Sequence, residues 1–268
     1  SNYAQYTHGS LLGFIAAWAN WVSLVTIIPI EAVSAVQYMS SWPWEWAKPM
    51  GALMKDGSIS TIGLFAVYVI IAIFSLLNYW SVKLLTSFTS LISVFKLGVP
   101  LLTIIMLMIS GFDTNNYGHS ASAFMPYGSA PIFAATTTSG IIFSFNAFQT
   151  IINMGSEIKN PEKNIARGIA ISLTLSAILY IVLQSTFITS MPSSMIHEHG
   201  WNGINFNSPF ADMAILLGIN WLAILLYVEA VVSPFGTGVS FVAVTGRVLR
   251  AMEKNGHIPK FLGKMNEQ

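Results

Sequence analysis

A single basic residue lies in the middle of a long apolar run. Lys96, within residues 93–100, stands 12 residues into a run that covers residues 84–110. At about 1.5 Å of helix per residue, it would lie roughly 18 Å into a hydrocarbon layer about 30 Å thick, too deep for its stem to reach water. Because burial favours the neutral amine, such a lysine can accept and release a proton. We predict that Lys96 couples a proton; a permanent ion pair with a buried carboxylate is the alternative.

Two acidic residues also fall inside apolar runs. Glu31 follows Pro29 near one end of the first run, and Glu229 lies near the middle of the last. Each carboxyl group could be the charge partner of Lys96, a gate, or a protonated hydrogen-bonding group, since ionisable residues within membranes mark functional pathways. These roles stay open at this point.

The last apolar run contains the segment Ser233-Pro234-Phe235-Gly236-Thr237-Gly238. Proline removes one helical hydrogen bond, and the glycines loosen the packing. The carbonyl groups freed here, with the hydroxyls of Ser233 and Thr237, are candidates for an ion site. A kink with close helix packing explains the same residues equally well.

The fourth run is the least lipid-like. Ser139, Asn146, Gln149 and Asn153 are separated by 7, 3 and 4 residues, which would place them on one face of a helix. That face predicts either the lining of a cavity or hydrogen bonding between helices. Gly140 would allow a break near mid-membrane, where broken helices expose backbone dipoles to bound ligands.

Long apolar runs must position these residues. The 268 residues are 54% hydrophobic and 9% charged, against roughly 25% charged in a soluble domain. Since lipid offers no hydrogen-bond partners, runs that cross it should be helical. We predict an all-α polytopic membrane protein, a single membrane domain over residues 1–268, with six transmembrane helices at about 10–37, 61–80, 84–110, 131–154, 165–190 and 216–245.

Basic residues indicate how the spans are oriented. Nine Lys and Arg fall on one side of the spans and two, Lys48 and Lys55, on the other. Because cytoplasmic loops are enriched in Lys and Arg, we expect a multi-pass protein of the cytoplasmic membrane with both ends of this chain in the cytoplasm. The chain begins at Ser1 without the layout of a signal peptide, so we interpret it as an excerpt.

Composition and motifs argue against several functions. A formal net charge of +1 provides no basic surface for nucleic acid, and the absence of Cys removes thiolate chemistry. The segment His197-Glu198-His199-Gly200 lies in a predicted outer loop and lacks the spacing of a zinc-binding helix. We therefore expect no metal, no cofactor and no enzymatic activity, and the partner that the composition predicts is the lipid bilayer.

Two segments resemble a known family. Residues 155–169, which include Glu157-Ile158-Lys159-Asn160-Pro161, resemble the segment between the sixth and seventh helices of amino acid permeases of the amino acid-polyamine-organocation superfamily. Residues 246–259, Gly-Arg-Val-Leu-Arg-Ala-Met-Glu-Lys-Asn-Gly-His-Ile-Pro, resemble the run after their eighth helix. The details resemble bacterial permeases for acidic or small amino acids, including aspartate-proton symporters.

This resemblance implies a fold. The chain is similar to helices three to eight of a leucine-transporter-type fold of inverted repeats, that is, the last three helices of one repeat and the first three of the other. The first two and the last four helices of the same full-length transporter would be missing, so the chain alone is not expected to transport.

The resemblance also implies roles for the charged residues. Lys96 matches a fifth-helix lysine that, in proton-coupled members, takes the place of the second sodium ion of sodium-driven relatives. Ser233 and Thr237 fall in the eighth-helix region that faces this lysine. Glu31 sits at the third-helix Glu position of several members.

The resemblance also implies which residues bind the substrate. Phe143 matches an aromatic position that faces the substrate in the unwound part of the sixth helix, and Gln149 falls where some members keep an acidic gate residue. The neutral amide of Gln149 departs from that pattern. The expected substrate-binding or gating residues are Ser139, Gly140, Phe143, Ser144, Asn146, Ala147 and Gln149.

The implied function is secondary active transport of amino acids by proton-coupled symport with alternating access. Its partners would be an amino acid and protons. A proton-independent amino acid exchanger or uniporter is one alternative, and a non-transporting membrane scaffold is another.

Overall fold

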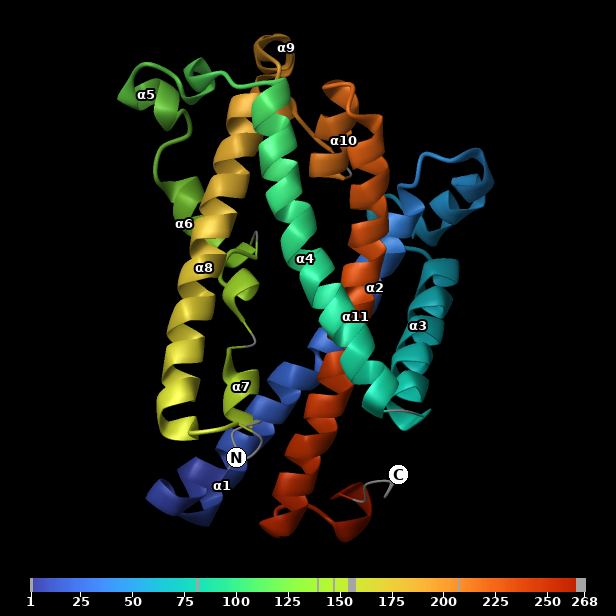
Figure 1. Cartoon of the computed structure of the whole chain (residues 1–268), viewed down its shortest axis with the longest axis vertical. Coiled ribbons are helices and arrows are strands. Elements are labelled where there is room, and N and C mark those ends of the chain that lie inside the picture. The colour runs from blue at the N-terminus through green and yellow to red at the C-terminus, as the bar shows by residue number, and fades with distance from the viewer. Residues whose placement is uncertain are drawn as a thin grey trace. The chain divides into compact units, whose positions relative to one another are not determined.

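Helices make up nearly all of the regular structure (Figure 1). The computed structural model describes residues 2–80, 82–138, 140–146, 148–153, 158–206 and 208–263. Within these ranges five helical stretches are long and apolar enough to cross a membrane: Ala4–Ser40, Thr61–Tyr79, Ser90–Ser110, Pro161–Ser190 and Asn220–Lys254. The predicted all-α polytopic membrane class is confirmed.

The chain divides into two compact units. The first comprises Ser1–Leu97 and Tyr227–Gln268, and the second comprises Gly98–Leu226. Two long helices, α4 (Val82–Ser110) and α11 (Asn220–Lys254), contribute to both units. The expectation of a single membrane domain stays a prediction.

In the first unit, α2 packs against α3 and η1. Helix α1 continues through Gly9, whose φ of +83° kinks it, and a turn at Thr26 separates it from α2. Besides parts of α4 and α11, this unit contains α1 (Asn2–Val25), α2 (Ile27–Ser40), η1 (Glu45–Leu53), β1 (Met54–Lys55), β2 (Ser58–Ile59), α3 (Thr61–Trp80) and η5 (Lys260–Gly263). The two strands pair antiparallel, with Met54 opposite Ile59.

Small residues and one amide join α11 to its neighbours. A methyl group on Gly236 would lie 2.6 Å from Cγ2 of Ile92 on α4, and one on Gly238 would overlap the ring of Phe74 on α3. Asn78 Nδ2 donates to the carbonyl of Val239 at 2.8 Å. The glycines of the 233–238 segment therefore serve close packing, which was one of its two interpretations.

In the second unit, α8 packs against α7, η2 and α10. This unit contains η2 (Thr114–Tyr117), α5 (Ala121–Phe124), α6 (Ala130–Thr138), η3 (Phe143–Phe145), α7 (Gln149–Asn153), α8 (Pro161–Ser190), α9 (Ser193–Gly203) and α10 (Pro209–Leu216). Ser190 Oγ donates to the carbonyls of Leu107, at 3.1 Å, and Gly111, at 2.8 Å. The segment that carries His197 and His199 was expected as a loop, but it lies in α9.

The fourth apolar run, residues 131–154, departs from the expected continuous helix. Helix α6 ends at Thr138, Gly140 takes a φ of +76°, and the chain makes only the short η3 before α7 begins at Gln149. A left-handed backbone is easy for glycine and stops a helix. The hydroxyls of Thr136 and Thr137 bond to carbonyls three residues back, which further competes with regular helix. The break that Gly140 would allow is present.

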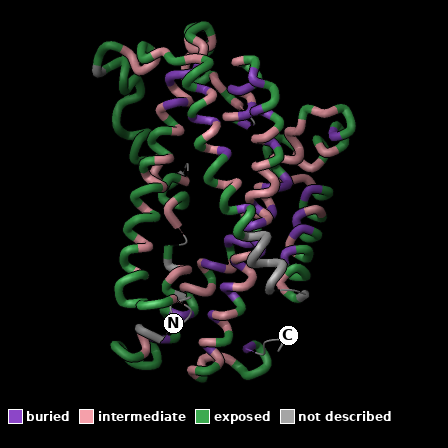
Figure 2. Tube along the Cα trace, viewed as in Figure 1, coloured by how far each residue is buried: buried purple, intermediate pink, exposed green. Residues whose placement is uncertain are grey.

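Much of the apolar surface is exposed (Figure 2). Along α8, Ile171, Leu175, Ile178 and Ile181 are each more than half exposed, whereas Thr186, Thr189 and Ser190 at the end of the helix are buried. In a membrane protein such a face meets lipid or other helices.

We expect Gly238→Ala to destabilise the first unit by about 1–3 kcal/mol, because the added methyl group must displace the fully buried Phe74 ring. Gly246→Ala, on the same helix with nothing within 4 Å of the new methyl group, is the matched control and should be neutral or slightly stabilising. Melting temperatures in detergent of the complete gene product that contains this sequence would measure both. Equal melting temperatures for the two variants would contradict the close packing.

Candidate functional site

Lys96 lies on α4 facing α11 within the first unit. Its Nζ donates a hydrogen bond to Oγ1 of Thr237, and Thr237 in turn donates to the carbonyl of Ser233 at 3.3 Å. All three side chains are half-buried. The structure thus brings together the lysine and both hydroxyl residues that the sequence singled out.

Two carboxyl groups act on Lys96 from different helices. Glu31, on α2, and Glu229, on α11, each interact electrostatically with the lysine. Within the described ranges, no ion pair of 4.0 Å or less joins either of them to Lys96. The ammonium is therefore held by a hydroxyl group, with the two carboxylates farther away.

Helical periodicity explains the face that α11 presents. Glu229, Ser233 and Thr237 follow one another at four-residue intervals, which aligns them along one side of the helix. Ser233 makes a side-chain hydrogen bond to Glu229. Pro234 lies inside the same helix, where it lacks an N–H to donate to the preceding turn. The polar side of α11 and the turn weakened by Pro234 therefore lie in the same part of the helix.

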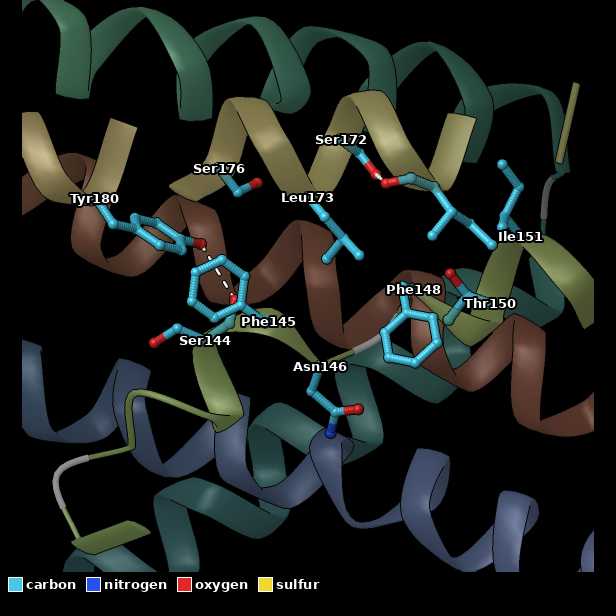
Figure 3. Close-up of a pocket in the computed structure, with 11 residues that line it drawn as sticks. Ser144, Phe145, Asn146, Phe148, Thr150, Ile151, Ser172, Leu173, Ser176 and Tyr180 are labelled. Carbon is cyan, nitrogen blue, oxygen red and sulfur yellow. Dashed lines mark hydrogen bonds between the residues drawn. The ribbon is translucent and has the colours of Figure 1, made fainter. Parts of the chain in front are cut away.

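A second group of polar residues surrounds a cavity in the second unit (Figure 3). The cavity has a volume of about 310 Å³ and lies between the broken segment and α8. Its lining consists of Ser144, Phe145, Asn146, Phe148, Thr150, Ile151, Ile169, Ser172, Leu173, Ser176 and Tyr180. A space of this size, with a few hydroxyl and amide groups on an apolar wall, suits a small polar molecule.

The side chain of Tyr180 anchors the irregular backbone to α8. Its hydroxyl donates to the carbonyl of Ser144 at 3.3 Å, and its ring meets that of Phe145 edge-on with centroids 5.4 Å apart; Figure 3 shows both contacts. Ser144 also closes a turn by donating two hydrogen bonds to the carbonyl of Gly140, one from its backbone N–H at 2.9 Å and one from its Oγ at 3.0 Å. The segment is irregular but held in place.

The residues expected to bind substrate are only partly found at the cavity. Ser144 and Asn146 line it, whereas Phe143 is 47% exposed and does not. Gly140 ends α6 rather than lining the cavity. Ser139 and Ala147 lie outside the described residues, and so does the side chain of Gln149, whose backbone begins α7.

The expected single polar face of the fourth run is wrong, because a helical face cannot continue through the break at Gly140. Sequence reasoning also missed the opposite wall. Ser172, Ser176 and Tyr180 stand at four-residue intervals along α8 and line the cavity. This polar stripe in an apolar helix was the available signal.

The fold and these sites define a class. A helix interrupted within an apolar run, beside a small polar cavity, together with an ionisable residue in the middle of a spanning helix, is typical of the membrane domains of secondary transporters.

Comparison with known proteins identifies the family. The sequence profile for amino acid permeases matches residues 1–268, and the chain belongs to that family. It is 49% identical to the glutamate/serine transporter AimA of Bacillus subtilis (strain 168) over 264 residues, which cover 98% of this chain and 49% of that protein. It is 35% identical to the aspartate-proton symporter of the same organism over 269 residues, 99% of this chain and 50% of that protein.

A more distant relative is an L-asparagine permease of Salmonella typhimurium, 23% identical over 282 residues that cover 100% of this chain and 51% of that protein. The chain thus spans about half the length of these curated relatives. The resemblance read from the sequence is confirmed, and so is its placement among permeases rather than enzymes.

We expect Gly140→Ala to cost about 1–2 kcal/mol, because an L-residue is strained at a φ of +76° even though nothing lies within 4 Å of the new methyl group. Gly98→Ala, which has equally open space but an ordinary helical backbone in α4, is the control and should not destabilise. Thermal unfolding in detergent would compare them. If both variants melt at the same temperature, the left-handed backbone at Gly140 is not a feature of the native protein.

Proposed function

We propose that this chain is the central part of a proton-coupled amino acid symporter of the cytoplasmic membrane that works by alternating access. The observation that carries the proposal is the mid-helix Lys96, hydrogen-bonded to Thr237 and flanked by two carboxyl groups. Amino acids as substrates are supported by the family and by the printed names of the relatives, one of which is a proton symporter. Proton coupling and orientation, with both ends cytoplasmic, belong to the proposal.

Lys96 can supply the coupling step. A proton on its amine creates a charge inside an apolar bundle, and the two nearby carboxyl groups and the Thr237 hydroxyl can stabilise that charge. Any movement that changes these surroundings changes the affinity for the proton. The proton can then drive the transition only as far as it binds the two conformations with different affinity.

The cavity beside the broken segment is the proposed contact for the amino acid. Carbonyl and amide groups of an irregular backbone can bind ammonium and carboxylate groups without added side-chain charge. Ser144 and Asn146 belong to this segment and line the space, and Tyr180 fixes it to α8.

In proteoliposomes that contain the complete gene product, an inward proton gradient should stimulate uptake of one class in a panel of radiolabelled amino acids. Lys96→Ala should remove the stimulation, lowering gradient-driven uptake at least tenfold, because it removes the amine whose protonation is proposed to drive the conformational change. Lys163→Ala changes an exposed lysine and should leave uptake unchanged. Undiminished gradient-driven uptake by Lys96→Ala would rule out the coupling role, and gradient-independent uptake by the wild type would instead favour an exchanger or uniporter. No uptake of any amino acid would favour a non-transporting scaffold.

Tyr180→Phe should raise the half-saturating amino acid concentration about fivefold, because one hydrogen bond of about 1 kcal/mol to the Ser144 carbonyl is lost while the ring contact with Phe145 remains. The dependence of uptake on the proton gradient should stay as in the wild type. Tyr79→Phe, at a 61% exposed tyrosine, is the control. Identical saturation curves for the two variants would remove the irregular segment from the substrate site.

A further inference from the structure

Helices α2 and α11 present protonatable groups to each other in an ordered way. The rings of Trp44, just beyond α2, and Tyr227 on α11 meet with centroids 6.0 Å apart. Next, Tyr38 on α2 interacts electrostatically with Glu229. The helices therefore run antiparallel here, and later residues of α2 lie beside earlier residues of α11.

This order leads from the side of residues 41–60 toward Lys96. Tyr38 and Glu229 come first, Ser233 follows one turn further along α11, and Thr237 with Lys96 follows after another turn. Each four-residue step advances about 6 Å along the helix. Glu229 is thus the carboxyl group that lies between Lys96 and the end of α2 that carries Trp44 and Tyr38.

The charges around Lys96 do not balance when all are ionised. Two carboxylates face one ammonium, which leaves an excess negative charge in apolar surroundings at a high desolvation cost. The two elements that pack against α2 do not correct it: α3 contains no Asp, Glu, Lys, Arg or His, and Glu45 and Lys48 of η1 form an exposed pair of their own at 2.5 Å. A proton on one of the two carboxyl groups removes the excess.

We propose that Glu229 holds this proton and passes it to Lys96 from the side of residues 41–60, while Glu31 remains the ionised counter-charge; this inference rests on the proposed function. The transfer takes place once Lys96 has released its own proton and is a neutral amine. The O–H bond of the Glu229 carboxyl group then breaks and an N–H bond forms at Nζ of Lys96, which leaves a carboxylate and an ammonium and does not change the net charge of the group. The excess negative charge that remains is removed when the Glu229 carboxylate takes up the next proton from the side of residues 41–60. No electron is transferred. The transfer requires Lys96 to rotate its flexible stem away from Thr237 and toward Glu229, and the side-chain hydrogen bond between Ser233 and Glu229 orients the carboxyl group.

Three variants of the complete gene product in proteoliposomes test this step: Glu229→Gln, Glu31→Gln and, as the matched control, Glu45→Gln at an exposed carboxylate. Two rates are measured for each, namely amino acid uptake driven by an inward proton gradient across a range of external pH, and counterflow of the same amino acid without a gradient. Glu229→Gln should lower gradient-driven uptake at least tenfold and flatten its pH profile, but lower counterflow less than threefold. Glu229→Asp, which keeps a carboxyl group, should recover part of the uptake.

The other outcomes overturn the assignment. Equal loss of uptake and counterflow in Glu229→Gln, without recovery in Glu229→Asp, would show a structural role. A wild-type pH profile in Glu229→Gln, or a selective loss in Glu31→Gln instead, would remove Glu229 from the path. If gradient-driven uptake is present in the wild type and lost in Lys96→Ala, the outcomes above reject only the role of Glu229 and leave the proposed function standing. If uptake by the wild type does not depend on the gradient, the proposed function fails as well.

Discussion

Hydrocarbon offers no hydrogen-bond partner, and this one constraint governs where polar groups lie in the chain. Hydroxyl groups inside the spans bond to the carbonyl one turn back, as Ser75 does to Ile71 and Ser240 to Gly236, each within its own helix. Asn78 uses its second proton to bridge from α3 to α11. Apolar side chains are then free to face outward, as along α8, because no backbone group needs water.

The same constraint explains why the irregular segment and the cavity occur together. Once Gly140 stops α6, the groups of residues 140–146 lose their helical partners and must find others. Some are satisfied by tight turns, such as Asn146 N–H to the carbonyl of Phe143 at 2.9 Å, and the Ser144 carbonyl is satisfied by Tyr180. Backbone that is neither helical nor exposed to lipid must line protein or a polar space, and here it lines the cavity.

The class of fold and the group around Lys96 could be read from the sequence, because both depend on run length and on rare charged residues in apolar surroundings. Lys96 stands out in this way, whereas Ser233 and Thr237 stand out through the proline and glycines of their segment, and only the family resemblance implies that they face the lysine. The structure brings all three together. The wall formed by Ser172, Ser176 and Tyr180 was not found, since small hydroxyl residues are common in spanning helices and their meaning depends on what faces them. The continuity of the fourth run was misjudged for a related reason: one glycine allows a break, but only tertiary contacts such as that of Tyr180 hold the broken form.

The hydrogen bond between Lys96 and the Thr237 hydroxyl also affects how easily Lys96 can gain or lose a proton. A lysine locked in a buried ion pair would lose several kcal/mol on deprotonation, because the carboxylate would then be left unpaired. The Thr237 hydroxyl accepts a hydrogen bond from the ammonium in the present arrangement, and a hydroxyl can equally donate to a neutral amine. Lys96 therefore keeps a partner in both protonation states, while Glu31 and Glu229 act on it from farther away. A small free-energy difference between the two states lets a modest gradient shift the population, which a tight ion pair would not permit.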